Sequence, residues 1–448
     1  MRLRAIVLAV TFAMAPFGAR AADLVVWWEK GRYPQEDEAV SEIIAAFEQD
    51  TGKRVELDQS STNDLGANAL AAIEAGKPPD FLFGFGRISS YYGQWAYEDR
   101  LVDLSDEILP FGSLFDPDAL GSATLYNAAT GQRALYALPM GFATNHVHIW
   151  RNLLEQAGFT LDDIPRQWEA FWSFWCEEVQ PSVRRATGRE DIWGVGLAMS
   201  NANDTFVEFE QFIQAYDANY VTREGKLVID DPEIRRRLIK TMESYTVIYR
   251  KGCTPPDSVD WEASGHDNNQ AFLTGTVVMV LNDSLSIPNA LKRERPEDYY
   301  ENTATIAWPD GTNSQPLAVR TGFLAATTFK AGGHVALAKE FVRFLVGEGW
   351  LMHYLDFSGE RMIPAISKLL DQPFWLDPSD RHHMASAIQF LTQPRDYKYW
   401  VASGDPRHLL VSREHVWGNA VHRVAAEGIS PEQAVDEAIA RIKQILKE

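Results

Sequence analysis

The sequence predicts an α/β protein built as two lobes, and three observations lead to this prediction. The chain of 448 residues is longer than one hydrophobic core usually supports. Strand-like and helix-like segments alternate along it, which is the pattern of a parallel sheet with helical crossovers. No linker, repeat or low-complexity tract separates two halves. The chain is therefore expected to cross between its lobes more than once.

The first 21 residues have the pattern of a secretory signal peptide. "MRLR" carries positive charge, "AIVLAVTFAMAPFG" is apolar, and "ARA" is a small-residue cleavage pattern. A membrane anchor is disfavoured, because a span needs roughly 20 apolar residues and Pro16 and Arg20 interrupt this stretch. We expect cleavage after about Ala21 and export to the periplasm.

The chain is acidic, with a formal net charge of −20. The signal segment contains Arg2, Arg4 and Arg20 and no acidic residue, so the mature chain is three charges more negative, at −23. This balance argues against nucleic acid and anionic membranes as partners.

Two cysteines remain in the mature chain, Cys176 and Cys253. Export makes a disulfide between them possible, and two separately buried thiols are the alternative; the sequence leaves both open. Neither cysteine has the neighbours of a metal site or of a Cys-His nucleophile, and we expect no cofactor and no metal.

The N-terminal segments predict strand, helix, strand, helix and strand in that order. Their expected ranges are a strand over 24–30, a helix over 36–52, a strand over 54–59, a helix over 64–76 and a strand within 78–86. Val40, Ile43, Ile44 and Phe47 recur at helical spacing in the first helix, which Gly52 ends.

The later segments continue the alternation. We expect two strand-like runs in 133–150 interrupted at Pro139–Gly141, helices over 151–159, 164–179, 231–252 and 334–350, a helix end, turn and strand over 270–283, and strands over 303–311 and 320–329. In the last helix Ser430 is the expected N-cap, Pro431 takes the first helical position, and Gln433 completes a capping box.

The order of several motifs resembles that of bacterial extracellular solute-binding proteins of ABC importers, in the carbohydrate-binding family 1 that includes maltose-binding protein. The motifs are "AAFEQDTGKRVEL", "AIEAGKPPDFLF", "LYALPMGFATNHVHIWRNLLEQAGF", "SGERMIP" and "VWGNAVHRVAAEGISPEQAVDEAIARIKQIL". Each motif alone is weak, and the resemblance rests on the ordered set over the mature chain.

The resemblance implies a two-lobe periplasmic-binding-protein fold with interleaved lobes. The N-terminal lobe would hold 22–138 and 309–357, and the C-terminal lobe 139–308 and 358–448. It also implies a monomer without enzymatic activity. The lobes would close by hinge motion on a small-molecule carbohydrate, which is delivered to the permease subunits in the inner membrane.

The first group of candidate ligand contacts follows the first and third strands, because ligands of such sheets bind beyond the carboxyl ends of strands. Aromatic rings would cover the sugar faces, and charged side chains would bind the hydroxyls. The candidates are Trp28, Glu29, Lys30, Arg32, Phe85 and Arg87. Alternation along the strand places Trp27 and Trp28 on opposite faces. Trp27, deeper in the strand, is assigned to the core, and Trp28, nearer the carboxyl end, to the opening of the cleft. The family's usual acidic residue is missing from "GFGR", which argues against a maltose-like binding mode.

The second group lies at the expected crossings and in the second lobe. It consists of Thr144, Asn145, Asp204, Asp283, Ser284, Arg361 and Trp417. Several have structural alternatives: Asp283 can cap a helix, Arg361 can pair with Glu360 instead of an anionic ligand group, and Trp417 can be core. His146, beside Asn145, is expected to be a structural histidine.

Two other functions compete with the sugar receptor. A receptor for a polyol, a phosphorylated glycerol compound or a polyamine would use the same fold. An exported glycosidase needs two carboxyls about 5–9 Å apart, and no motif singles out such a pair. The chain also contains no P-loop, zinc-protease or Gly-x-Ser-x-Gly motif.

Overall fold

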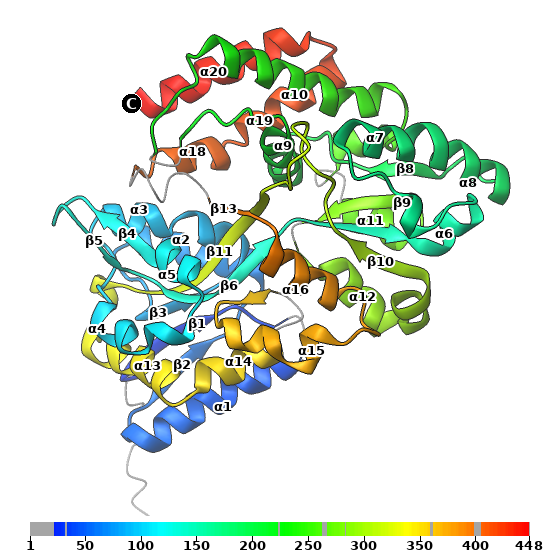
Figure 1. Cartoon of the computed structure of the whole chain (residues 1–448). Coiled ribbons are helices and arrows are strands. Elements are labelled where there is room, and N and C mark those ends of the chain that lie inside the picture. Colours follow the sequence, from blue (N-terminus) through cyan, green and yellow to red (C-terminus); the bar gives the residue numbers. More distant parts are fainter. Residues whose placement is uncertain are drawn as a thin grey trace, which may run out of the picture.

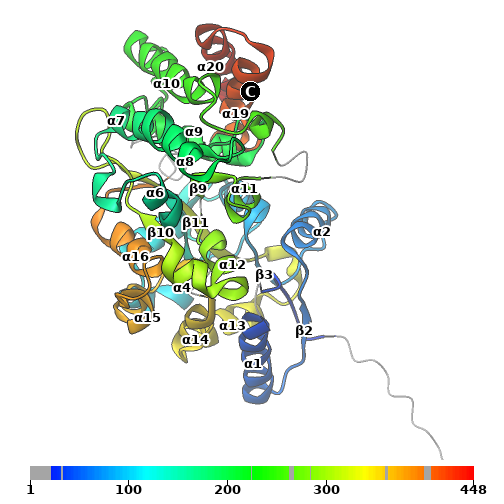
Figure 2. The ribbon, with the colours of Figure 1, turned by 90° about the vertical axis from the view of Figure 1, so that its right-hand side faces the viewer.

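The computed structural model describes residues 22–31, 34–222, 225–261, 267–282, 284–358, 362–397 and 405–447. The predicted signal peptide and the candidates Arg32, Asp283 and Arg361 lie outside these ranges. Figures 1 and 2 show two α/β regions, one containing β1, β2 and α1 and the other containing β8, β9 and α20. Within the described ranges, no helix combines the length and the hydropathy of a membrane span.

The first region is built on a seven-stranded mixed sheet with the order β12-β6-β11-β3-β1-β2, to which β13 adds beside β11. Its strands are β1 (Leu24–Trp28), β2 (Val55–Asp58), β3 (Phe81–Phe83), β6 (Leu138–Thr144), β11 (Val319–Thr328), β12 (Ile363–Pro364) and β13 (Arg395–Tyr397). β1 is parallel to β2 and β3, as predicted, whereas β11 is antiparallel to β3 and β6.

Helices and a short hairpin surround this sheet. They are α1 (Pro34–Thr51), α2 (Thr62–Glu74), η1 (Gly86–Ser90), α3 (Tyr92–Tyr97), α4 (Ser105–Ile108), η2 (Leu109–Leu114), α5 (Pro117–Ala123), β4 (Thr124–Asn127), β5 (Gln132–Leu135), η7 (Lys330–Gly332), α13 (Val335–Gly347), α14 (Trp350–Ser358), η8 (Ser367–Asp371), α15 (Pro373–Leu376) and α16 (His383–Thr392). The four apolar residues predicted for α1 are buried, and Phe47 among them packs edge-on against Phe341 and Phe344 of α13. Gly52 ends α1 with a φ of +66°.

The second region is built on a four-stranded sheet with the order β10-β7-β9-β8. Its strands are β7 (His146–Trp150), β8 (Trp193–Gly196), β9 (Val277–Asn282) and β10 (Thr303–Ile306). Its helical segments are α6 (Arg151–Gln156), η3 (Leu161–Asp163), α7 (Trp168–Ser173), η4 (Phe174–Val179), α8 (Gln180–Thr187), α9 (Asn203–Ala215), α10 (Pro232–Arg250), η5 (Pro256–Asp260), α11 (Asn268–Leu273), α12 (Ser286–Glu294), η6 (Asp298–Asn302), α18 (His408–Arg413), α19 (Val416–His422), η9 (Arg423–Glu427) and α20 (Pro431–Lys447).

The strand break predicted at Pro139–Gly141 is wrong, because β6 runs through these residues. Pro139 lies opposite Ala325 and Gly141 opposite Leu324, with a register shift between them. Met140 is therefore the extra residue of a bulge, which accommodates a proline that cannot donate to the ladder. The chain instead leaves the strand at Asn145, between β6 and β7.

The lobe boundaries also differ from the predicted division. β6 belongs to the first sheet, although residues from 139 on were assigned to the second lobe. Met362, Trp375 and Phe390 are buried in the first core, and β12 extends the first sheet along the edge of β6. Residues from α18 onward pack in the second core. The segment after "SGER" stays with the first lobe because β6 leaves an edge that it can cover.

Cys176 and Cys253 form a disulfide, which settles the alternative that the sequence left open. It joins η4 to the segment after α10, at a sequence separation of 77 residues. The backbone N–H of Gln433 donates to Ser430 Oγ at 3.1 Å, as predicted for the N-cap. The Gln433 side chain donates to Glu437 instead of completing the capping box.

Candidate functional site

The two regions meet where strands of the first sheet lead into the second. β6 continues into β7 at Asn145, β10 leads into β11, and β13 pairs with β11 on the path toward α18. Figure 1 shows β6, β11 and β13 close to the boundary between the two regions; β6 runs antiparallel to β11, and β13 runs parallel to β11. The candidate site was therefore built from the side chains at these crossings and at the carboxyl ends of β1 and β3.

Glu29 fastens the loop that follows β3. Its side chain is 2% exposed, and its carboxylate accepts a hydrogen bond from the N–H of Phe85 at 2.6 Å. A Cβ at Gly84 would lie 3.3 Å from this carboxylate and 2.8 Å from Ile88 Cδ1, so glycine allows the close approach. Glu29 thus positions the loop, while the neighbouring Lys30 is exposed.

The prediction that Trp27 is the core residue and Trp28 the one at the cleft is wrong. Trp28 is fully buried, with ring centroids 5.6, 5.4 and 4.8 Å from those of Phe81, Phe83 and Tyr354. Trp27 is the half-buried one. The reason is that α14, which carries Tyr354, covers the face of β1 on which Trp28 lies. Trp28 is a core residue of the first lobe.

Phe85 is half-buried, and its ring lies 5.4 Å from that of Phe83. Arg87 lies in η1, and its side chain is not among those described. The loop after β3 therefore presents Phe85 as the described ring nearest to the end of the strand.

A contact that the sequence did not predict joins α18 to η1 and α3. The guanidinium carbon of Arg413 lies 3.6 Å from the ring centroid of Tyr91, and Tyr91 stacks on Trp95 at 5.6 Å and 24°. Arg413 Nη1 donates to Gln94 Oε1 at 2.6 Å, and Nη2 donates to the carbonyl of Ser90 at 2.9 Å. Burial lowers the pKa of Arg413, but a guanidinium keeps its proton in proteins. A cation of the second lobe thus holds an aromatic stack of the first.

The sequence carried a partial signal for this contact. The segment "SSYYGQWAY" places four aromatic residues directly after the third strand, which is typical of a surface with a stacking role. Arg413 itself stands in "LLVSREHVW", where no spacing distinguishes it from other surface arginines.

The side chains beside Asn145 at the first crossing are structural. Thr144 Oγ1 lies 3.2 Å from His146 Nε2, which is also 2.8 Å from Ser386 Oγ of α16. His146 is 1% exposed, and burial depresses its pKa far below the ordinary value. The expectation that His146 is structural agrees with these contacts.

Asn145 differs from its neighbours, because its backbone carbonyl accepts hydrogen bonds while its side chain forms none with the described residues. Its carbonyl accepts hydrogen bonds from Trp308 Nε1 at 3.0 Å and Gln389 Nε2 at 2.9 Å. Its side chain is 2% exposed, yet among the described residues neither Oδ1 nor Nδ2 has a hydrogen-bond partner. A buried polar group left in this way costs about 1–3 kcal/mol.

The direction of the Asn145 side chain follows from the extended chain around it. Successive side chains of such a chain point to opposite sides. Since His146 faces α16, Asn145 points away from α16. The carboxamide is therefore a donor and an acceptor that is buried at the crossing, with no partner among the described residues.

The remaining candidates lie in the second lobe. Asp204 is half-buried in the first turn of α9, and Ser284 is half-buried with its hydroxyl on Asn282 Oδ1 at 3.3 Å. Trp417 is fully buried between Phe209 and Tyr220, at centroid distances of 5.5 and 5.7 Å. The core alternative holds for Trp417, because α19 packs so closely on α9 that a Cβ at Gly418 would lie 3.0 Å from the carbonyl of Ala202.

The sequence of this chain matches a known protein family. The family described as "Bacterial extracellular solute-binding protein" matches residues 42–379. Among curated proteins, none matches the chain significantly.

Solved structures of low sequence identity share the fold. An ABC transporter solute-binding protein from Thermotoga lettingae bound with α-D-tagatose is 17% identical with a TM-score of 0.72, over 94% of this chain and 99% of that one. The maltose-bound MalE3 of T. maritima is 18% identical with a TM-score of 0.71 and the same coverage. A sugar transporter from Arthrobacter chlorophenolicus with bound laminaribiose is 13% identical with a TM-score of 0.70, over 95% of this chain and all of that one. The two-lobe architecture thus extends over nearly the whole chain.

Proposed function

The chain belongs to the bacterial extracellular solute-binding proteins, and from this premise we propose that it is the periplasmic receptor of an ABC importer. In this proposal it captures a sugar or oligosaccharide between its two lobes and delivers it to the permease in the inner membrane. The structural neighbours support the ligand class, since their printed ligands include tagatose, maltose and laminaribiose.

The observation that carries the proposal is the carboxamide of Asn145. It is buried at the crossing between the lobes and has no partner among the described residues. A sugar hydroxyl donates and accepts at once, so it matches an amide that offers one donor group and one acceptor. A ligand bound there relieves the cost of the unpaired amide, which favours the bound state.

The other proposed ligand contacts follow from exposure. Exposed surface remains on Lys30 after β1, Phe85 after β3, Ser284 after β9 and Asp204 in the first turn of α9. Thr144 is buried against His146 and is left out. Glu29 supports the loop that carries Phe85. Arg32, Arg87, Asp283 and Arg361 remain predictions from the sequence, and Trp28 and Trp417 are left out because both are core.

Closure of the lobes would use the contact between Arg413 and Tyr91. Ligand binding shifts a two-state equilibrium only through contacts that differ between the states. A contact that joins α18 to η1 and α3 exists only while the lobes are close together. In the proposed mechanism it adds to the ligand's own contacts and stabilises the closed form that docks on the permease.

In this proposal the protein is exported to the periplasm and does not convert its ligand chemically. The signal segment would be cleaved after about Ala21, and the mature chain would act as a monomer. The polyol alternative has support from one further neighbour, a solute-binding protein from Agrobacterium radiobacter in complex with ribitol, with a TM-score of 0.67 and 16% identity.

A panel experiment tests the function and separates its alternatives. The purified mature protein is incubated with mono- and oligosaccharides, polyols, glycerol phosphates and polyamines, while the melting temperature and the release of products are both followed. We expect one class of sugar to raise the melting temperature without being cleaved. Cleavage of any sugar would identify a glycosidase. Stabilisation by a polyamine alone would show that the protein is a polyamine receptor and not a sugar receptor.

A further inference from the structure

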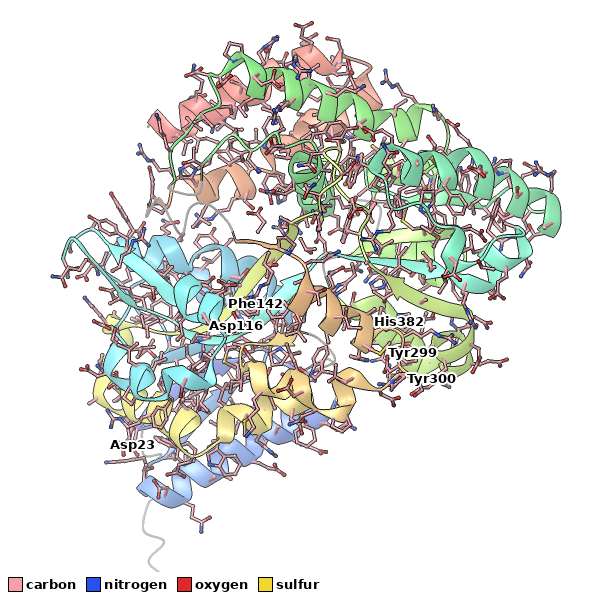
Figure 3. All side chains as sticks on the ribbon, in the orientation of Figure 1. Asp23, Asp116, Phe142, Tyr299, Tyr300 and His382 are labelled. Atoms are coloured by element: carbon pink, nitrogen blue, oxygen red, sulfur yellow. A yellow bond between two sulfur atoms is a disulfide. The ribbon has the colours of Figure 1, made fainter. Side chains whose placement is uncertain are left out.

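Four buried histidines connect three elements behind the first crossing. His146 and His148 lie on β7, His382 precedes α16, and His383 opens it; each is at most 1% exposed. The imidazoles of His146 and His148 stack at 5.7 Å, and His148 lies 6.3 Å from His382. Figure 3 shows His382 and Tyr299 near each other, close to the right-hand end of α16.

Hydroxyl groups link these imidazoles across the boundary between the lobes. Thr305 Oγ1 of β10 lies 2.8 Å from His148 Nδ1 and 2.7 Å from His382 Nδ1. On β7, His146 Nε2 reaches Ser386 Oγ of α16 at 2.8 Å. The histidine network, defined as His146, His148, His382 and His383 with these partners, thus attaches α16 of the first lobe to β7 and β10 of the second.

Tyr299 and Asp380 complete the network at its far end. The hydroxyl of Tyr299 and Nδ1 of His383 both lie 2.9 Å or less from Asp380 Oδ2. Burial tends to raise the pKa of Asp380, but the hydrogen bonds from His383 and Tyr299 outweigh it and the pKa is lowered. Asp380 is therefore ionised at neutral pH.

Several charged groups surround the network, and Asp380 favours a charge on His382, although burial outweighs this effect on the pKa of His382. Lys292 of α12 lies 3.5 Å from Asp380 Oδ2 and 5.3 Å from the ring centroid of Tyr299. Arg381 donates to the carbonyl of Tyr300; the nearby Arg295 and Asp298 pair with each other, and Asp377 adds a further carboxylate close to Asp380. Among the described residues, no carboxylate forms an ion pair with His146, His148 or His382.

We propose that the histidine network is an acid-sensitive lock on the hinge: protonation of its buried imidazoles separates α16 from β7 and β10 and frees the lobes to move. The proposal rests on the proposed function in one respect: in the receptor, movement of the lobes serves ligand binding. The network attaches α16 to β7 and β10 whether or not a ligand is bound. Acid would therefore open the receptor and weaken its hold on the ligand.

The sign follows from burial. Burial lowers the pKa of His148 and of His382 to about 3, and that of His146 well below its ordinary value. An imidazole exposed to water titrates near pH 6.5. Above that pH the three imidazoles are neutral whether α16 is attached or not. Below it, the detached state takes up protons that the attached state excludes, so falling pH favours detachment.

The network does not have the arrangement of a metal centre. In the part of the chain that the structure describes, no three His, Cys, Asp or Glu side chains are grouped to hold a metal ion. Threonine and serine hydroxyls instead engage His146 Nε2, His148 Nδ1 and His382 Nδ1, and backbone carbonyls lie near His148 Nε2 and His382 Nε2. Titration is therefore the chemistry that this arrangement offers.

Interlobe distances measured against pH test the lock. Spin labels are placed on the exposed positions Ser41 of α1 and Glu243 of α10, each changed to cysteine, and their separation is measured from pH 7.5 to 4.5 in the full mature chain. We expect the distance distribution to broaden and lengthen below about pH 6.5, with uptake of two or more protons. The variant carrying His148→Asn and His382→Asn should lose at least half of this response. His353→Asn, a histidine of α14 that pairs with Glu42 outside the network, should keep it.

Two results would overturn the lock. One is an unchanged distance across this pH range in the wild-type chain, and the other is a full response in the double variant. If the double variant does not fold, histidine-selective NMR of the wild-type protein decides, since separate titration of the buried imidazoles near pH 6.5 without a distance change contradicts the proposal. No sugar is present in these measurements, so failure of the receptor function would leave their outcome unaffected.

Discussion

Asn145 and His146 are neighbours in sequence with opposite surroundings. The imidazole of His146 bonds to Ser386, whereas the carboxamide of Asn145 has no partner among the described residues. Burial of an unpaired amide costs about 1–3 kcal/mol in the state without ligand, and the proposed sugar would relieve this cost. The difference between the two residues follows from the alternation of side chains at the crossing.

Removing the Asn145 amide should separate ligand binding from stability. We expect Asn145→Ala to raise the Kd for the stabilising sugar about 10- to 100-fold, because one to two buried hydrogen bonds are lost. The unfolding free energy of the protein without sugar should stay equal or rise, since an unpaired amide is removed. Calorimetric titration and thermal melts measure the two effects.

The control for this prediction is Asn419→Ala, at an exposed amide of α19. It should leave the Kd unchanged. A loss of stability in Asn145→Ala with an unchanged Kd would mean that the amide is structural.

Arg413 should act on closure without touching the core. Replacing Arg413 by Ala removes a cation–π contact and two hydrogen bonds across the lobes, so we expect about a 3- to 30-fold weaker affinity and a larger interlobe separation by spin-label distance. Arg423→Ala is the matched control, since Arg423 pairs with Glu427 and Glu437 within the second lobe. Equal effects of the two variants on affinity and on interlobe separation would contradict a role of Arg413 in closure.

Predictions for single residues succeeded where a local rule decides the outcome. The spacing in α1 identified its buried residues because a helix face has a fixed period. The roles of Trp27 and Trp28 came out reversed, because both faces of β1 are apolar and only the position of α14 determines which face is fully covered. The prediction that Trp417 contacts the ligand is wrong for a related reason. The motif predicts the helix, but the close packing of α19 on α9 buries the ring.

At the scale of elements, most strands and helices follow from apolar periodicity and caps. One exception is β6, where a proline and a glycine predicted a break. The structure retains the strand through a bulge opposite Leu324 and Ala325. Long-range pairing with β11 supplies the hydrogen bonds that make this possible, and the sequence of β6 alone contains no trace of them.

The disulfide between η4 and the end of α10 should contribute strongly to stability. Closing a loop of 77 residues corresponds to roughly 4 kcal/mol in the chain-entropy picture, less any native strain. We expect the double variant Cys176→Ser with Cys253→Ser to unfold at a clearly lower denaturant concentration. Ligand affinity should remain within about twofold, because the bond joins η4 to the segment after α10 within the second lobe.

The outcome for this pair is read from urea unfolding of the variant and of the oxidised and reduced wild-type protein. Reduction should reproduce the loss caused by the variant. An unchanged midpoint in both cases would show that the bond does not constrain the unfolded chain.

At the scale of the whole molecule, the two-lobe architecture was predictable and its exact division was not. Chain length, the strand–helix alternation and the absence of a linker indicate two interleaved lobes. Residues 362–390 join the first lobe because β12 and its neighbours cover the edge of β6, and such edge contacts are set by the assembled sheet. The histidine network arises at this level too, since His148 and His382 are 234 positions apart and meet only through Thr305.

The most direct test of the account is the crystal structure of the mature protein with the sugar that raises its melting temperature most. The account predicts one uncleaved sugar between the lobes, with a hydroxyl hydrogen-bonded to the Asn145 carboxamide and Arg413 seated on Tyr91. A sugar bound on an outer face, a cleaved sugar, or an Asn145 amide that does not contact the ligand would contradict it.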